Sequence, residues 1–134
     1  RRQRQMCIRD SPMRWNQIKE LSHRGHIIGA HTMDHYMINT TDEAVLRYQI
    51  CSCKAIIEEQ TELPCTYFAF PYGKLSEANE LSIEIACSCY PYVFSQSDYK
   101  NYFSFSGKVI NRRHFEPFWP KRHVFYFLSC KKNF

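Results

Sequence analysis

The sequence predicts an α/β fold in which helices join parallel strands. Segments with helical periodicity alternate along the chain with short apolar runs of strand length, and this alternation is typical of parallel strands with helical crossovers. The chain has 134 residues, of which 44% are hydrophobic and 16% aromatic. Such a length and composition indicate one domain at most, with enough apolar side chains to build a core.

The first eleven residues, RRQRQMCIRDS, are expected to lie outside this fold. They resemble a translated reading frame of the adapter used in transposase-based DNA sequencing libraries, and a natural basic tail is the alternative. Removing their four arginines and one aspartate from the totals of 18 and 13 leaves 14 basic against 12 acidic residues. Because residues 12–134 are then nearly neutral, we expect no nucleic-acid partner. No apolar run approaches the ~20 residues of a membrane helix, so no transmembrane segment is expected either.

Two helices and a strand are expected before residue 60. A helix over Pro12–His23 has a proline in its first turn and Gly25 as its C-terminal cap. The apolar run Ile27–Ala30 has the length of a buried strand. Thr40 and Glu43 form an S/T-x-x-E capping box that opens the second helix. Spacings of four, three and four mark the buried side of that helix, formed by Leu46, Ile50, Cys53 and Ile57.

The rest of the chain continues the alternation. A strand over Thr66–Phe70 runs into the turn Pro71-Tyr72-Gly73, and Ser76 caps a third helix carrying Ala78, Leu81 and Ile85. A third strand covers Tyr92–Ser95 and is followed by a polar and aromatic loop. A fourth strand lies near Val109–Asn111, and a last helix begins at about Pro117.

The seven cysteines include two C-S-C pairs, Cys51 with Cys53 and Cys87 with Cys89. Both pairs fall inside helical patterns, where residues i and i+2 point about 200° apart, so neither pair is expected to bind one metal ion. The cysteines after residue 11 are therefore expected to be small buried or half-buried thiols. The compartment of the protein stays open.

A pair of histidines follows the first expected strand. His31 and His35 are separated by three residues, and the turn Pro71-Tyr72-Gly73 follows the next strand. Strand ends of parallel α/β folds gather functional groups, so these two turns are expected to share one pocket. Two neutral imidazoles would suit a divalent metal, with Thr32 and Asp34 bracing the loop through backbone hydrogen bonds. The alternative is an ordinary polar turn, which is also our interpretation of His23, His26 and His123.

The stretches GHIIGAHTMDH and FAFPYG together resemble the polysaccharide deacetylase family, also called the NodB-homology or carbohydrate esterase family four domain. The first stretch matches its H-S/T-x-x-H motif, whose two histidines are metal ligands. The second is similar to its R-x-P-Y motif, which forms a wall of the substrate groove. The resemblance covers roughly Trp15 to Arg113 and implies that residues 12–134 are the C-terminal portion of a distorted (β/α) barrel.

This resemblance also implies an activity, which is the removal of N-acetyl groups from amino sugars of a polysaccharide or oligosaccharide. A divalent metal, with zinc as the expected ion, would be held by His31 and His35 and would activate water. The backbone N–H of Tyr72 would help to stabilise the oxyanion. Pro71 and Gly73 would shape that turn and, with Tyr72, contact the substrate.

The sequence departs from the family pattern at three places. Nothing before Trp15 matches the aspartate pair that supplies the family's general base and third metal ligand. Ala69 replaces the arginine of R-x-P-Y, and Arg112 or Arg113 is the candidate to restore its charge, with an exposed charged turn as the alternative. His114 lacks the L-x-H frame of the family's general acid. We therefore expect an enzyme as the full protein and an inactive fragment here, or alternatively a non-catalytic carbohydrate- or metal-binding domain on the same fold.

Overall fold

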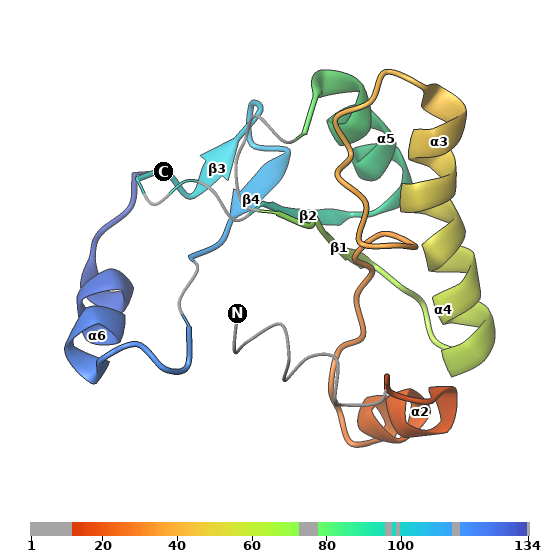
Figure 1. Ribbon diagram of the computed structural model, residues 1–134, viewed down its shortest axis with the longest axis horizontal. Helices are drawn as coiled ribbons and strands as arrows, with labels where there is room; N and C mark the ends of the chain where they lie inside the picture. Colours follow the sequence, from red (N-terminus) through yellow and green to blue (C-terminus); the bar gives the residue numbers. More distant parts are fainter. Residues whose placement is uncertain (1–11, 73–77, 96–97, 99, 114–115, 134) are drawn as a thin grey trace.

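A four-stranded sheet forms the centre of the computed structural model (Figure 1). The strands are β1 (Tyr67–Ala69), β2 (Tyr92–Ser95), β3 (Phe103–Ser104) and β4 (Val109–Asn111), in the order β1-β2-β4-β3. β1, β2 and β4 run parallel, as the sequence predicts, and β3 pairs antiparallel with β4. The structure describes residues 12–72, 78–95, 98, 100–113 and 116–133, so the expected adapter-derived segment 1–11 lies outside it.

The first helix is confirmed as α2 (Trp15–His23), but it begins at Trp15, so Pro12 precedes the helix and does not lie in its first turn. Gly25 follows the helix with φ +88°, as a C-terminal cap requires. The strand expected over Ile27–Ala30 is wrong. Only Ala30 pairs with the sheet, through a single parallel bridge to Phe68, and Ile27 is 70% exposed. An apolar run of four residues has the composition of a strand, but here only its last residue reaches a partner strand.

One long helical segment follows, divided into α3 (Glu43–Arg47), η1 (Tyr48–Ser52) and α4 (Cys53–Thr61). The middle part, η1, is a π-helical turn that the sequence pattern did not predict. The residue that caps the helix is Asp42, whose carboxylate accepts from the backbone N–H groups of Ala44 and Val45, so the capping box predicted with Thr40 is wrong. The predicted stripe is confirmed: three of its members are buried and Ile57 packs against them.

Helix α5 (Glu80–Cys89) begins four residues after the predicted cap. Asn79 caps it, with its side chain accepting from the backbone N–H of Ser82, and Ala78 precedes the helix. Ser76 lies outside the described residues. Asn79 also donates to the carbonyl of Thr40, which ties the start of α5 to the segment before α3.

Two cysteines expected to be thiols form a disulfide. Cys51 in η1 and Cys89 at the end of α5 are bonded, with Cα atoms 6.1 Å apart. The divergence of residues i and i+2 on a helix explains this pairing. Each C-S-C pair directs one sulfur toward the other helix, while Cys53 and Cys87 remain free thiols.

The last elements differ from prediction at two points. β3 lies in the segment expected to be a loop, and α6 (Lys121–Ser129) begins after Pro120 rather than near Pro117. Proline favours the start of a helix, and the second of these two prolines is the one that precedes regular helix. Among the described residues, no helix is long and apolar enough to cross a membrane.

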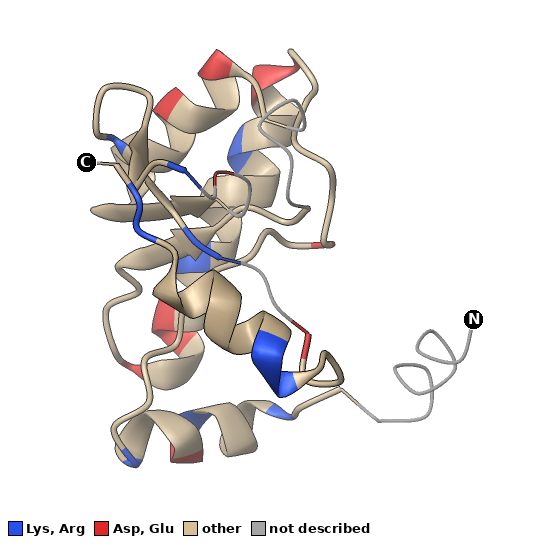
Figure 2. Cartoon of the chain, turned by 90° about the vertical axis from the view of Figure 1, so that its left-hand side faces the viewer, with Lys and Arg blue, Asp and Glu red and all other residues tan. Residues whose placement is uncertain are grey.

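The helices are unevenly distributed about the sheet. Figure 1 shows α3, α4 and α5 together on one side of the strands, whereas α6 lies on the opposite side of the molecule. Side chains toward the first group of helices are buried, including Phe68, Val93 and Val109, which lie opposite one another in register. Figure 2 shows basic and acidic residues both distributed over the helices. We call the side of the sheet toward α3–α5 the covered face and the other side the open face.

Candidate functional site

Three predicted residues come together at the carboxyl ends of the parallel strands. His31 follows the bridge residue Ala30, and Tyr72 lies three residues after β1. The ring of His35 lies between them, with ring centroids 5.0 Å from His31 and 4.9 Å from Tyr72. The three rings are therefore in contact, as the two converging turns predict, whereas a pocket shared by all three stays a prediction.

The His31 ring is held by the backbone of β1. Its Nδ1 lies 2.8 Å from the carbonyl oxygen of Ala69. A carbonyl oxygen only accepts, so Nδ1 carries the proton and donates, which leaves the Nε2 lone pair to bind a ligand. Metal-binding histidines commonly use their second nitrogen in this way, because the hydrogen bond fixes both the tautomer and the ring orientation.

The surroundings of His31 favour its neutral form. Partial burial is the main cause that lowers the pKa of His31, and the nearby charges of His35 and Arg112 lower it further. The hydrogen bond to Ala69 acts in the opposite direction and is outweighed. Neutral imidazole is also the form in which a histidine can accept a metal.

The spacing of the two imidazoles fits one tetrahedral metal ion. Zn–N distances of about 2.1 Å and a tetrahedral angle would place the two ring centroids about 5.2 Å apart. The observed separation between His31 and His35 is 5.0 Å. The two rings are arranged edge to face, with 69° between their planes. The separation of the two rings therefore matches this spacing, which is also that of an ordinary edge-to-face contact between aromatic rings.

The loop between the histidines is partly braced as predicted. The Thr32 hydroxyl accepts from the backbone N–H of Tyr36 at 3.2 Å. Asp34 also braces the loop, but its carboxylate accepts from the side-chain amide of Gln49 rather than from a backbone group. Thr32 and His35 both have left-handed backbone, with φ of 68° and 53°. Non-glycine residues adopt this conformation only where their surroundings enforce it.

The turn after β1 has its own backbone constraint. Pro71 is buried, and Tyr72 is exposed with φ +64°. Gly73, which the sequence predicts to shape this turn, lies outside the described residues. The left-handed conformation at Tyr72 directs its ring onto His35, which places the turn beside the histidine pair.

Arg112 and Arg113 are adjacent in sequence but separate in space. Arg112 lines a pocket of about 300 Å³ together with His31, Tyr67 and Phe94. Its Nη2 is buried and has no hydrogen-bond partner among the described residues. Arg113 instead donates to the carbonyls of Phe127, Leu128 and Cys130 at the end of α6. The structure thus brings Arg112, and not Arg113, to the histidine pair.

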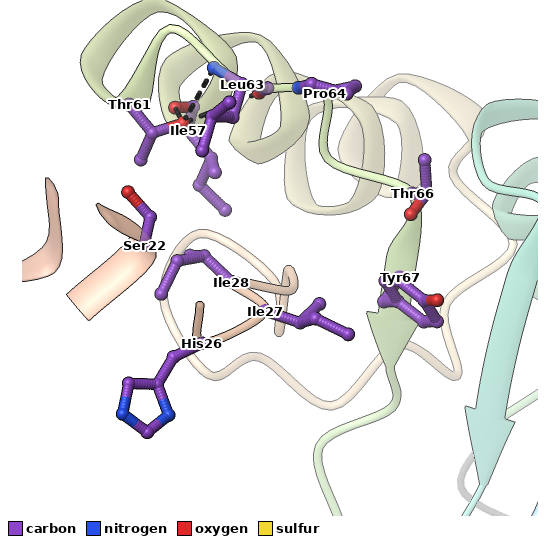
Figure 3. A pocket seen from close by; sticks show the side chains of 10 residues that line it. All are labelled: Ser22, His26, Ile27, Ile28, Ile57, Thr61, Leu63, Pro64, Thr66 and Tyr67. Carbon is purple, nitrogen blue, oxygen red and sulfur yellow. Dashed lines mark hydrogen bonds between the residues drawn. The ribbon is translucent and has the colours of Figure 1, made fainter. Parts of the chain in front are cut away.

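The other histidines that the structure describes lie away from this site. His26 lines a separate pocket of about 330 Å³ between α2, α4 and the start of β1, together with apolar side chains such as Ile28 and Ile57 (Figure 3). His23 ends α2 and His123 lies in α6, while His114 is outside the described residues. Within the parts of the chain that the structure describes, no three His, Cys, Asp or Glu side chains form a group able to hold a metal.

Two contributors to the site were missed from the sequence. The first is the Ala69 carbonyl, a backbone group whose hydrogen bond to His31 cannot be predicted from any pattern of side chains. Gln49 is a polar residue beside the buried stripe position Ile50, and it is itself only 5% exposed. Gln49 lies three residues after Leu46 and four before Cys53, so helical spacing alone places this polar residue on the buried side, where it needs a partner.

Comparisons with known proteins identify the family and the fold. Residues 4–88 match the family model of polysaccharide deacetylases. The fold is similar to that of the Streptococcus pyogenes deacetylase PplD in complex with acetate, with a TM-score of 0.73 and 17% identity over 91% of this chain and 53% of that one. No curated protein sequence matches the chain.

Two further solved structures share the fold. A de-N-acetylase from Aggregatibacter actinomycetemcomitans has a TM-score of 0.67 and 13% identity, covering 86% of this chain and 53% of that one. IcaB from Ammonifex degensii has a TM-score of 0.62 and 23% identity, covering 80% and 49%. The chain spans about half the length of each of these structures. By its family match, its mixed α/β sheet and its histidine motif, the chain belongs to the polysaccharide deacetylase family.

Proposed function

We propose that the protein is a metal-dependent hydrolase that removes N-acetyl groups from amino sugars of a polysaccharide or oligosaccharide. The observation that carries this proposal is the histidine pair at the strand ends. His31 is fixed by its Nδ1 bond to Ala69, and its ring lies 5.0 Å from that of His35. A divalent ion, with zinc as the expected one, would be held by these two imidazoles.

The ion, when bound, would supply a Lewis acid for the acetamide carbonyl and a nucleophilic water at neutral pH. The backbone N–H of Tyr72 would donate to the oxyanion that forms on that carbonyl. Pro71 and Tyr72, with Gly73, would form one wall of the sugar groove. These roles rest on the family motif and on the contact between Tyr72 and His35.

Arg112 would orient the general base. Its Nη2 is buried without a described partner in the pocket that His31 also lines. A buried guanidinium of this kind would bind a carboxylate and keep it ionised by lowering its pKa. We assign this role to Arg112 rather than to Arg113, because Arg113 donates to α6.

The third ligand and the base would come from aspartates outside residues 12–134. Two imidazoles are fewer than the three protein ligands usual at catalytic zinc sites, and the described residues provide no third. We therefore expect the chain of 134 residues to bind zinc weakly and to release no detectable acetate. A non-catalytic carbohydrate- or metal-binding domain is the second candidate function, and it is the incomplete ligand set that favours it.

The test uses the chain extended by the coding sequence upstream of it. We expect zinc-dependent release of acetate from N-acetylglucosamine oligomers, which His31→Ala or His35→Ala abolishes. His26→Ala is the matched control, because His26 lines the other pocket, and it should leave the rate unchanged. Normal deacetylation with either site histidine removed would refute the metal role. Oligosaccharide binding without acetate release would establish the second candidate.

A further inference from the structure

The π-helical turn η1 lies directly beside the histidine loop. π turns inside α-helices are rare and occur frequently at functional sites. Gln49, the second residue of this turn, is 5% exposed although its side chain is polar. A buried amide is costly unless its donor and acceptor are both used, so its partners indicate what the turn is for.

All described hydrogen bonds of the Gln49 side chain go to the histidine loop. Its Oε1 accepts from the backbone N–H of Asp34 at 3.2 Å, and its Nε2 donates to the Asp34 carboxylate at 2.8 Å. The Gln49 carbonyl also accepts from the backbone N–H of Met33 at 3.1 Å. One residue thus makes three hydrogen bonds to two consecutive loop residues.

These bonds lie between the two strained positions of the loop. Thr32 precedes them and His35 follows them, and both have left-handed backbone. Such a conformation costs on the order of 1 kcal/mol or more for a non-glycine residue, so neighbouring contacts must hold it. The bonds from Gln49 hold the intervening residues while the chain reverses and brings the His35 ring back to His31.

Cross-links hold the π turn from the other side. Cys51, two residues after Gln49, is bonded to Cys89, and the Ile50 carbonyl accepts from the buried hydroxyl of Tyr90 at 2.7 Å. The backbone that carries the Gln49 side chain is therefore attached to Cys89 at the end of α5 and to the following residue, Tyr90. A rigid support of this kind is what a precise ligand geometry requires.

We propose that Gln49 is a positioning residue that holds the His31–His35 loop in its metal-binding conformation. It acts through Asp34 and Met33, and none of its described hydrogen bonds reaches either histidine. The proposal rests on the proposed function for the identity of the ligand, and on the hydrogen bonds above for the positioning itself.

The experiment uses the chain of 134 residues and compares Gln49→Ala with Gln60→Ala, an exposed glutamine in α4. Zinc affinity is measured by competition with a chromophoric chelator, and amide hydrogen exchange is measured at Met33 and Asp34 without metal. We expect Gln49→Ala to accelerate exchange at Asp34, whose backbone N–H loses its acceptor, and to weaken zinc binding at least tenfold, as the loss of outer-shell partners does. Met33 serves as the internal reference, because its acceptor is the backbone carbonyl of residue 49, which alanine retains. Gln60→Ala should change neither quantity.

A reciprocal exchange of groups separates positioning from simple packing. Gln49→Glu alone places a second carboxylate against Asp34 and should weaken zinc binding as well. Adding Asp34→Asn restores the hydrogen bond between the two side chains in the reverse direction. The amide at position 34 then donates to the carboxylate at position 49. We expect this double variant to recover zinc affinity to within about threefold of the original chain.

The outcomes of this proposal and of the proposed function are distinguishable. Zinc affinity that survives Gln49→Ala unchanged would overturn the positioning role, as would a double variant that fails to recover while remaining folded. If the original chain binds no zinc at all, the expected weak binding by His31 and His35 is refuted, and the proposed function is decided separately by deacetylation in the extended protein. The exchange rate at Asp34 then decides the positioning role on its own, and an unchanged rate there would overturn it.

Discussion

Tyr67 and Phe68 are neighbours in β1, yet their side chains meet opposite surroundings. Phe68 is fully buried on the covered face, where its ring stacks on Tyr90. Tyr67 is half-buried on the open face and stacks on Tyr92, which is 48% exposed. The covered face thus carries the packing that stabilises the fold. The open face carries the pocket that His31 lines.

This separation runs through the whole sheet. The core residues from α3 to α5 pack on the covered face. The pocket on the open face is lined by Tyr67, Ala69 and Phe94 from the strands, and by His31 and Arg112 at their ends. Parallel sheets are usually covered on both faces, so an aromatic face exposed to this extent is unusual. Substitutions on the covered face should therefore lower the free energy of unfolding more than substitutions on the open face.

The largest expected effect is on the covered face. Phe68→Ala should lower the free energy of unfolding by about 3–5 kcal/mol, because it removes a fully buried ring and leaves a cavity. Tyr92→Ala is the matched change on the open face and should cost about 1 kcal/mol or less. Urea denaturation of both variants measures the difference. Equal losses would show that the open face is packed in solution.

The disulfide should have the next largest effect. Cys51→Ser removes a cross-link that closes 38 residues and should lower the free energy of unfolding by roughly 2–4 kcal/mol. Cys87→Ser, a free thiol in the same helix as Cys89, should change it by less than about 1 kcal/mol. Thermal unfolding without reductant measures both. Peptide mapping that finds Cys51 and Cys89 as thiols would contradict the cross-link.

The sequence was sufficient for the elements whose signal is local or periodic. The stripe of α3 to α4 and the strands β2 and β4 follow from hydrophobic spacing, and Gly25 marks the end of α2 by its own backbone preference. The histidine site was accessible because strand ends converge in any parallel sheet.

Features that depend on distant partners were not accessible. Ile27–Ala30 has a strand composition, but pairing depends on what lies beside it, and only Ala30 has a partner. The disulfide joins residues 38 positions apart on two helices, and no spacing rule selects that pair. Arg112 and Arg113 are indistinguishable in sequence, and only the placement of α6 separates them.

Arg112 should reveal a conflict between stability and function. Arg112→Met removes a buried guanidinium whose Nη2 has no described partner, and should raise the free energy of unfolding by about 1 kcal/mol. The Ser95 carbonyl keeps a donor, since the backbone N–H of Arg112 lies 2.9 Å from it. In the extended protein the same change should abolish deacetylation.

Arg113→Met provides the contrast. It removes donors from the carbonyls at the end of α6 and should lower the free energy of unfolding by about 1 kcal/mol. Urea denaturation measures both arginine variants. A loss of stability in Arg112→Met would indicate that its guanidinium is already paired in solution.

The smallest expected effect is the pH dependence that His31 contributes on the open face. Partial burial is the main cause that holds the pKa of His31 below its ordinary value of 6.5 in the folded protein. The folded state thus prefers neutral imidazole, while the unfolded chain binds a proton near pH 6.5. The stability from this preference is complete above pH 6.5 and is lost as the pH falls through that value toward the folded pKa. His31→Gln cannot titrate and should show a shallower loss of stability between pH 7 and pH 5. Ring resonances followed by NMR should give a His31 midpoint below 6.5, and a midpoint above it would mean that the ring is solvated and its bond to Ala69 dominates.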